Sequence, residues 1–494
     1  MTPRPDDLRP ARRDLWIALV ALTAYALLAQ HTLYNRDAHV LLLLADEGAR
    51  LHNHHLLFFP GLNLLKAIGT PLGLSLYGSA VAYTALGTAI GVACTHAANV
   101  RLGLRRTEAL LATALVAACP AVVFFATVVE VHGPFFAFAG LAFWMAVRFT
   151  SAPGAGSAAL VGVAVGGASL AHATGLLLPL AIAPVAAGRL RDRRGLALAG
   201  LALAVAVAIA LGVPMLLRAT GDLPGGEESA AGHLGLRLRQ VAATGGLAIE
   251  LPRALGFRLL REWLWPYLPL SVAGLATLAA PGVRRRALLF AAALAGYLLL
   301  ATVLLWPFRD NDEHGAYLLP LAWPAALLVV RALPAATRVL VLLSVVVALV
   351  QIGQHDRPER SRAFADGLRA HAAPATPFLI VGYYDDVEAL VIHLLPELEG
   401  HYLALQRLPP LSEALLPRLL ARLDQEIDAQ RSAGHPAYIS DDACTSLSSA
   451  FFADPAVPGS QPLLPRLLAH LRQRYEFERV DSGGFAGYLL HPRP

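Results

Sequence analysis

Long apolar blocks, separated by short polar segments, make up the first 354 residues of the chain. Most of the blocks approach the ~20 residues with which an α-helix crosses the hydrocarbon core of a bilayer. Eleven membrane-spanning helices are predicted, at about 15–30, 72–99, 109–128, 133–149, 158–171, 173–188, 196–217, 265–281, 287–306, 316–333 and 339–354. This pattern is typical of a polytopic α-helical membrane protein.

From about residue 376 the pattern changes to short buried-type strands that alternate with amphipathic helices. Strands are expected at 378–381, 437–439 and 487–490, and helices at 411–428 and 463–475. Such alternation predicts a small α/β layer domain, so the chain divides into a transmembrane domain, 1–354, and a C-terminal domain, 355–494. Asp385 and Asp386 follow the first strand. They either bind a ligand at the carboxyl edge of the sheet or, as is more usual, start a helix.

Composition agrees with a membrane protein. Hydrophobic residues make up 56% of the chain and charged residues 15%, and the mean hydropathy is +0.54. In a typical soluble domain roughly 45–50% of the residues are apolar and about 25% are charged. These values exclude a disordered protein and an ordinary soluble enzyme. The net charge is +5, but the low share of charged residues leaves no broad basic face, so no nucleic-acid partner is expected. Cys94, Cys119 and Cys444 show no zinc-binding or disulfide spacing.

The arginines mark one side of the predicted membrane domain. The loops on this side hold Arg101, Arg105, Arg106, Arg148, Arg189, Arg191, Arg193, Arg194, Arg284, Arg285, Arg286, Arg331 and Arg338. Cytoplasmic loops of membrane proteins carry an excess of Lys and Arg, so this side and the N-terminus are expected in the cytoplasm. An odd number of spans then places the C-terminal domain outside, in the periplasm or the extracellular space.

Carboxylates and histidines gather on the opposite, outer side. The first outer loop, about 31–63, contains Asp37, Asp46, Glu47, His52, His54 and His55, and later outer loops contain Glu130, His132, His172, Asp312, Glu313 and His314. Ionisable groups near the hydrocarbon are costly and usually line a cavity or a functional path; the alternative is that they only solvate the loops. The residues that we expect to approach one another in one site are Asp37, Glu130, His132, Asp312 and Glu313.

Three motifs on the outer side resemble the GT-C superfamily, whose members are polytopic glycosyltransferases that use polyprenyl-phosphate-linked sugars. In the first outer loop Asp37 is followed by a histidine-rich turn and the apolar-proline stretch Leu56–Pro60. Glu130-Val131-His132 is similar to the Glu-Val-Tyr element of bacterial members related to the protein O-mannosyltransferases, with His in place of Tyr, and Ser169–His172 is similar to another stretch. The resemblance covers about 1–354 and implies a GT-C-like fold with an outer soluble tail.

The resemblance also implies roles for individual residues. The family's aspartate in the first outer loop acts as the catalytic base or organises the acceptor and any metal, and Asp37 matches its position. Glu130 and His132 are implied as further catalytic residues, and Asp46 with Glu47 is the second candidate for the base. A carboxylate suits this chemistry because the acceptor hydroxyl loses a proton as it attacks the sugar. Asp37 is equally suited to cap a helix, and both roles are compatible.

A lipid-phosphate donor requires cations on the outer side, and the amphipathic stretch Leu234–Leu264 provides them. Arginine grips phosphate through two parallel hydrogen bonds while its stem lies on apolar surface. Arg258 and Arg261 are expected to reach the donor phosphate; the alternative is an interfacial helix with arginines that extend to the headgroups. Residues expected to bind the acceptor or support the catalytic residues are Asp46, Glu47, His54, His55, Asp312, Glu313 and His314.

No cofactor is required by the sequence, and a divalent metal ion is the one candidate left open. His52, His54 and His55 offer imidazole nitrogens that suit a metal, although closely spaced loop histidines more often cap, stack or contact headgroup phosphate. The expected partners are a polyprenyl-phosphate-linked sugar, the lipid bilayer, and an acceptor that is a glycan, a lipid or a protein.

The sequence therefore predicts an integral glycosyltransferase of the bacterial inner or plasma membrane, which moves a sugar from a polyprenyl-phosphate donor to an acceptor at the outer face. The alternative is a transporter or flippase of lipid-linked glycans. Transporters usually contain internal repeats and broken helices with charges near the bilayer midplane. Here no clear repeat is found, and the ionisable residues lie at the ends of the predicted spans.

Overall fold

The structure is a computed structural model. The described residues are 12–34, 36–52, 54–189, 192–223, 239, 250–304, 313–382, 385–398, 400–405, 416–445 and 463–493. The chain forms two compact units. The helical unit comprises Met1–Gln30 and Gly48–His355, and the second unit comprises His31–Glu47 and Asp356–Pro494.

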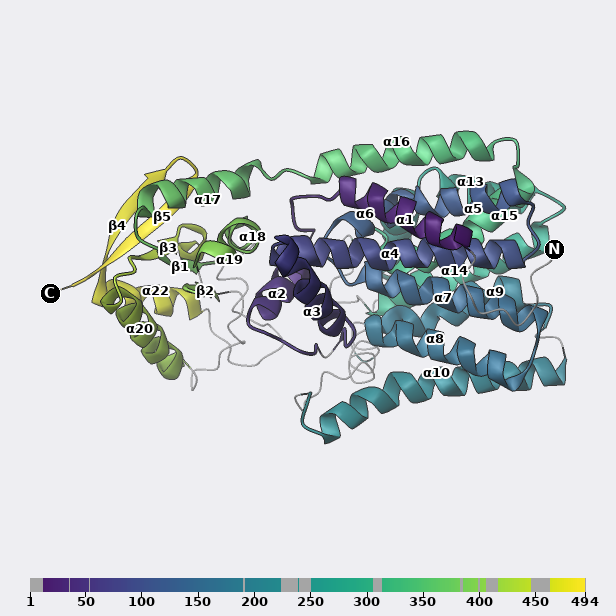
Figure 1. The fold of residues 1–494 in the computed structure, drawn as a ribbon, viewed down its shortest axis with the longest axis horizontal. Coiled ribbons are helices and arrows are strands. Elements are labelled where there is room, and N and C mark those ends of the chain that lie inside the picture. The colour runs from purple at the N-terminus through teal and green to yellow at the C-terminus, as the bar shows by residue number, and fades with distance from the viewer. Residues whose placement is uncertain are drawn as a thin grey trace. The chain divides into compact units, whose positions relative to one another are not determined.

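The described part of the helical unit consists almost entirely of helices (Figure 1). Its α-helices are α1 (Arg12–Leu27), α3 (Phe58–Gly69), α4 (Leu76–Arg101), α5 (Arg106–Ala117), α6 (Pro120–Thr127), α7 (His132–Ser151), α8 (Ala155–Ala171), α9 (Leu178–Ala186), α10 (Arg193–Ala219), α12 (Glu250–Arg258), α13 (Leu270–Ala276), α14 (Arg284–Leu304), α15 (Ala322–Ala332) and α16 (Thr337–His355). Shorter helical turns are η1 (Thr70–Leu72), η2 (Ala173–Leu177), η4 (Leu259–Leu264), η5 (Thr277–Ala279) and η7 (Ala316–Leu321). Each of the predicted apolar blocks contains at least one of these α-helices.

The number of membrane crossings stays a prediction. Within the described part of the chain, five helical stretches are long and apolar enough to cross a bilayer: Leu76–Arg101, His132–Ser151, Arg193–Ala219, Arg284–Val303 and the stretch that begins at Thr337. A sixth is the pair α5 and α6, which the sequence pattern predicts as one span and which is bent by 58°. Pro120, the first residue of α6, explains the break because proline lacks an N–H group and clashes with a preceding helical turn.

Glycines bring α4 and α7 into backbone contact along their length, and Figure 1 shows the two helices side by side. A Cβ atom added to Gly87 would lie 2.7 Å from the carbonyl oxygen of Gly133, and one added to Gly140 would lie 2.4 Å from that of Gly91. Small residues at membrane-helix interfaces permit such close approach. The pair therefore forms a closely packed frame for the residues at the start of α7.

Buried polar pairs join other helices of this unit. Nδ1 of His96 on α4 lies 2.6 Å from Oδ1 of Asp14 on α1. Asn99 on α4 donates to Thr113 on α5 at 3.1 Å and accepts a hydrogen bond from the indole of Trp323 on α15 at 2.9 Å. Polar groups inside a membrane domain are stable only when they pair with one another, so these contacts fix how the helices pack.

The second unit contains a five-stranded sheet, which agrees with the predicted small α/β domain. Its strands are β1 (Phe378–Val381), β2 (Tyr402–Ala404), β3 (Ala437–Ser440), β4 (Tyr475–Ser482) and β5 (Phe485–Pro492), in the order β2-β1-β3-β5-β4. β1 is parallel to β2 and β3, and β5 is antiparallel to β3 and β4. The sequence pattern misses β2, which is very short, and β4, which follows a helix without an intervening turn.

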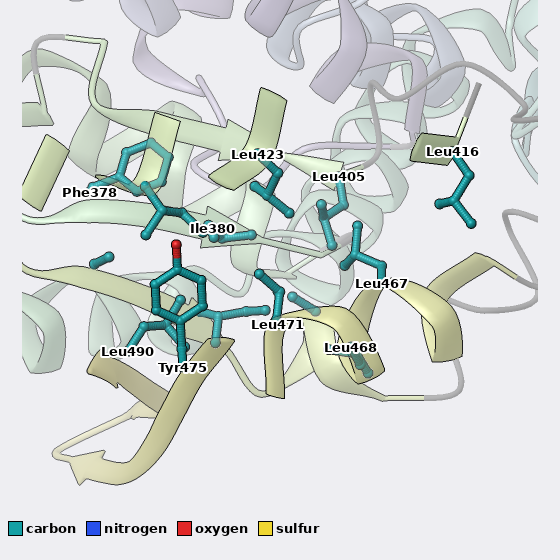
Figure 2. Close-up of a cluster of buried hydrophobic side chains, with 14 residues drawn as sticks. Phe378, Ile380, Leu405, Leu416, Leu423, Leu467, Leu468, Leu471, Tyr475 and Leu490 are labelled. Atoms are coloured by element: carbon teal, nitrogen blue, oxygen red, sulfur yellow. The ribbon is translucent and has the colours of Figure 1, made fainter. Parts of the chain in front are cut away.

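Helices accompany the sheet in the second unit, and two of them pack on it to form the apolar core in Figure 2. The helices are α2 (Arg36–Asp46), α17 (Glu359–Ala372), α18 (Asp385–Ala389), α19 (Leu395–Leu398), α20 (Leu416–Ser432) and α22 (Leu463–Arg474), with the turns η8 (Leu390–Leu394) and η10 (Asp442–Cys444). Phe378 and Ile380 of the sheet face Leu423 of α20 and Leu471 of α22. The Asp385-Asp386 pair starts helix α18, as such a pair more often does.

The first outer loop is divided between the two units. Its residues up to Glu47 pack with the C-terminal part of the chain, whereas the sequence pattern groups the whole loop with the membrane domain. The backbone N–H of Leu33 donates to Glu388 at 3.0 Å, and the hydroxyl of Tyr402 donates to Asp46 at 2.8 Å. These bonds join residues more than 350 positions apart, so hydrophobic periodicity does not reveal them.

Candidate functional site

Glu130 lies in the short connection between α6 and α7, where its side chain is buried. Its Oε2 accepts a hydrogen bond from the backbone N–H of Val131 at 2.5 Å, and Nδ1 of His132 lies 3.3 Å from the same oxygen. The hydroxyl of Thr84 on α4 donates to the Glu130 carbonyl at 3.2 Å. The carboxylate is therefore held in place, and it orients the imidazole of His132.

A series of neighbouring histidine rings extends from His132 to His52, His54 and His55 of the first outer loop. The rings of His132 and His172 lie 4.9 Å apart between centroids. The ring of His172 stacks on His55 at 5.4 Å, and His55 stacks on His52 at 5.1 Å. His54 lies beside both loop histidines, at 5.8 and 6.4 Å. Three separate segments of the chain thus form one histidine cluster.

The histidine cluster consists of half-buried and buried aromatic rings. Loss of hydration, together with the neighbouring His172, lowers the pKa of His55 well below its usual value, so His55 is neutral at pH 7. Its Nδ1 lies 3.2 Å from the carbonyl oxygen of Ala171. Within the described ranges, no group of three or more His, Cys, Asp or Glu side chains is arranged to hold a metal ion. His55 stacks on both His52 and His172, with interplanar angles of 11° and 17°, whereas the other ring pairs are tilted or edge-on.

Arg258 lies at the end of α12 with no exposed surface. Its Nη1 donates to Oε1 of Glu262 at 3.2 Å, one turn further along. Its Nε and Nη2 have no hydrogen-bond partner among the described residues. These two nitrogens form the edge of a guanidinium that pairs with two oxygens of a carboxylate or phosphate. A buried donor without a partner is costly, so this edge is suited to an anionic ligand.

Glu262 in turn organises the chain around Gly315. Its two carboxylate oxygens accept hydrogen bonds from the backbone N–H groups of Glu313 at 2.6 Å and Gly315 at 2.7 Å. Gly315 has φ of +80°, and an added Cβ atom would lie 2.6 Å from the ring of Tyr267. The hydroxyl of Tyr267 donates to the Gly315 carbonyl at 2.7 Å. Only glycine fits this turn, which places residues 313–317 next to the arginine.

Aromatic side chains connect the arginine region with the glutamate region. The ring of His314 lies 4.3 Å from Phe124, and Phe125 lies 4.9 Å from His132. Tyr317, from the same turn as His314, lies 6.1 Å from His132 and 5.4 Å from His172. Arg258, Glu130 and the histidine cluster therefore belong to one contiguous group of side chains within the helical unit.

The structure brings together many of the residues that the sequence singles out. Those in this contiguous group are Glu130, His132, His54, His55, Arg258, Glu313 and His314. The side chain of Arg261 is exposed, so Arg258 is the better candidate for a buried anion. Asp312 lies outside the described residues.

The three carboxylates of the first outer loop belong to the second unit. Asp37 is exposed in the first turn of α2, and Glu47 is exposed just after the helix. The carboxylate of Asp46 accepts the hydroxyl of Tyr402. The approach of Asp37 to Glu130 concerns two separate units and stays a prediction.

Sequence reasoning missed two residues of the site, Glu262 and Tyr317. Glu262 is four positions after Arg258, the spacing that places an acid and a base on one helix face, so the pair was detectable. Tyr317 lies inside an apolar block and gives no local signal. Its contact with His132 depends on how η7 packs against α7.

The chain matches no known protein family by sequence, and no curated protein resembles it in sequence. Two solved structures of ArnT from Cupriavidus metallidurans are similar in fold. The apo form is 14% identical and has a TM-score of 0.53, and the form bound to undecaprenyl phosphate is 14% identical with a TM-score of 0.56; each comparison covers 97% of both chains. At this identity the similarity concerns the fold alone. It confirms the predicted fold class, a GT-C-like helical domain followed by a small α/β domain.

Proposed function

We propose that this protein is a membrane glycosyltransferase that moves a sugar from a polyprenyl-phosphate-linked donor to an acceptor at the outer membrane face. The observation that carries the proposal is the buried guanidinium of Arg258, whose Nε and Nη2 have no partner among the described residues. The proposal is supported by the shared fold with ArnT, which has been solved with undecaprenyl phosphate bound.

Arg258 is assigned to the phosphate of the lipid donor. Glu262 holds Nη1, which leaves the Nε and Nη2 edge to donate two parallel hydrogen bonds to phosphate oxygens. Charge–charge interactions are stronger in a buried site than in water. When the bond between the anomeric carbon and the phosphate oxygen breaks, the bonding electrons stay with the lipid phosphate. Arg258 stabilises the charge that develops there.

Asp37 is assigned as the base that takes the proton from the acceptor hydroxyl as its oxygen bonds to the anomeric carbon. Glu130 and His132 are assigned to the reacting sugar and acceptor, because Glu130 fixes the imidazole with which the histidine cluster begins. The same region contains the residues assigned to hold Glu130 and His132 in position, which are His54, His55, Glu313 and His314.

A panel of radiolabelled polyprenyl-phosphate sugars, incubated with the purified protein, tests this function. We expect one donor to be transferred to an acceptor or to be hydrolysed slowly, with release of polyprenyl phosphate. If no donor is consumed, but labelled lipid-linked glycan crosses the bilayer of proteoliposomes, the protein is a transporter and the proposal fails.

The matched variant for this assay is Asp37→Asn. Asparagine caps a helix about as well as aspartate but does not accept the proton, so the expected loss is about 10²–10⁴-fold in rate with an unchanged melting temperature. Asp46→Asn is the control, since Asp46 is bonded to Tyr402. Wild-type transfer by Asp37→Asn together with loss in Asp46→Asn would move the base to Asp46.

A further inference from the structure

A second polar site lies in the helical unit, away from the histidine cluster. It is a cavity of about 160 Å³ between the ends of α4, α9, α14 and α15. Its lining includes Leu102, Pro184, Arg286, Pro324, Leu328 and Arg331. Apart from the two arginines, all of the residues that line the cavity are apolar.

The cavity lies at the opposite end of α4 from Glu130. Thr84 of α4 donates to the Glu130 carbonyl, whereas Leu102, the C-cap of α4, lines the cavity. The 18 residues between them span about 27 Å of helix, close to the ~30 Å thickness of a hydrocarbon core. The alternation of arginine-rich loops assigns this end to the cytoplasmic face, opposite to the proposed transfer site.

The positive charges of Arg286 and Arg331 are not neutralised by the described residues. Both side chains are exposed, and neither forms a hydrogen bond or ion pair with the described residues. Two like charges that border one cavity repel each other, and an anion between them removes the repulsion. Arg286 lies in the first turn of α14 and Arg331 in the last turn of α15. The two cations therefore reach the cavity from different helices.

We propose that this cavity binds the headgroup of an anionic phospholipid of the cytoplasmic leaflet, with the lipid phosphate between Arg286 and Arg331. Basic pockets between transmembrane helices on this side are known to bind such headgroups. The apolar part of the lining, which includes Pro324 and Leu328, favours a lipid over a soluble phosphate, because a hydrated anion gains nothing from apolar contact. The site is independent of the glycosyl-transfer proposal, since it shares no residue with it.

Native mass spectrometry of the purified protein with added lipids tests the site. We expect phosphatidylglycerol or cardiolipin to be retained in preference to phosphatidylcholine. A basic residue near an anionic surface contributes about 1 kcal/mol, so the double variant Arg286→Gln/Arg331→Gln should bind the anionic lipid about 30-fold more weakly. The control Arg284→Gln/Arg338→Gln removes the same charge from exposed arginines that do not line the cavity and should bind almost as well as the wild type.

Three results would overturn the proposal. The first is an equal loss in both double variants, because the arginines then attract lipid only as general surface charge. The second is equal retention of phosphatidylcholine. The third is displacement of the lipid by glycerol phosphate at matched concentration, which would make the ligand a soluble phosphate. Circular dichroism verifies that each variant is folded, and sugar transfer is measured separately so that failure of one proposal is distinguished from failure of the other.

Discussion

Arg258 in the helical unit and Arg369 in the second unit present the same guanidinium edge to different surroundings. Nε and Nη2 of Arg369 donate to the two oxygens of Glu397 at 2.8 and 2.7 Å, and Nη1 donates to Asp366 at 2.7 Å. Among the described residues, Arg258 has only Glu262 as a partner, through Nη1.

The difference between the two arginines separates a structural role from a ligand-binding one. The Arg369 side chain is 38% exposed and is nevertheless fully engaged by the protein, whereas the Arg258 side chain has no exposed surface. Water would satisfy spare donors on the exposed residue at little cost, but an unbonded donor in the interior is expensive. The buried edge of Arg258, unpaired among the described residues, is the observation on which the proposed phosphate-binding role rests.

The largest expected effect follows from changing Arg258. Arg258→Lys keeps a positive charge beside Glu262 but loses the planar two-donor edge. If this edge stabilises the leaving phosphate, sugar transfer falls by about 10²–10³-fold, as for loss of one donor to a developing oxyanion. Turnover of the labelled donor is the measurement, with Arg261→Lys as the exposed control three positions away.

Sugar transfer by Arg258→Lys at the wild-type rate would contradict a phosphate-binding role for Arg258. Loss of transfer in Arg261→Lys instead would reassign the phosphate to the exposed arginine. Melting temperatures of both variants distinguish a lost donor contact from a misfolded protein.

A smaller effect, this time on stability, is expected for Glu262→Gln. The amide keeps the size of the side chain, but it removes the charge that faces Arg258 and weakens the bonds from Glu313 and Gly315. Hydrogen bonds to buried charged groups contribute roughly 1.5–3 kcal/mol, so we expect the free energy of unfolding to fall by about 2 kcal/mol. Denaturant titration in detergent measures it. Glu108→Gln, in the exposed Arg105–Glu108 pair, is the control and should show no measurable change.

Arg369→Lys is expected to have a modest effect on stability and none on sugar transfer. Lysine keeps the charge but loses the two parallel bonds to Glu397, and partly exposed ion pairs contribute about 0.2–1 kcal/mol. Thermal unfolding measures the change. A loss of sugar transfer in Arg369→Lys would show that an arginine fully bonded within the protein also matters to the reaction, which would contradict a purely structural role for Arg369.

The smallest effect concerns salt. Raising the salt from about 0.1 to 1 M shortens the screening length from about 10 to 3 Å, so the stability difference between wild type and Arg369→Lys should shrink by a few tenths of a kcal/mol. The difference between wild type and Glu262→Gln should stay almost constant, because that pair is buried. Equal salt dependence of the two differences would mean that both pairs are solvated.

The helices of the membrane part were predictable because apolar blocks of bilayer length leave few other structures. The apolar blocks do not show how the helices bend or which distant segments pack together. The bend at Pro120 required attention to one residue within an apolar run, and the packing of α2 with the C-terminal part depends on hydrogen bonds such as Tyr402 to Asp46. Hydropathy does not register such contacts between distant segments.

The site was predictable to a similar degree. The clustering of ionisable residues at the ends of spans identified Glu130, His132 and His314, because charge is costly in hydrocarbon wherever it occurs. The sequence did not distinguish Arg258 from Arg261, since both lie on the same amphipathic stretch. Burial decides between them, and burial depends on how the π-helical turn η4 packs against its neighbours.

The backbone contacts between α4 and α7 fix one half of the site in place. Where Gly87 meets Gly133 and Gly91 meets Gly140, the backbones of the two helices are in direct contact, so neither helix slides without losing this close packing. His132 begins α7 and is carried by this rigid pair. Arg258, by contrast, is held by a single side chain and a short turn. If a lipid donor binds at Arg258, we therefore expect the structural adjustment on the arginine side, with His132 staying in place.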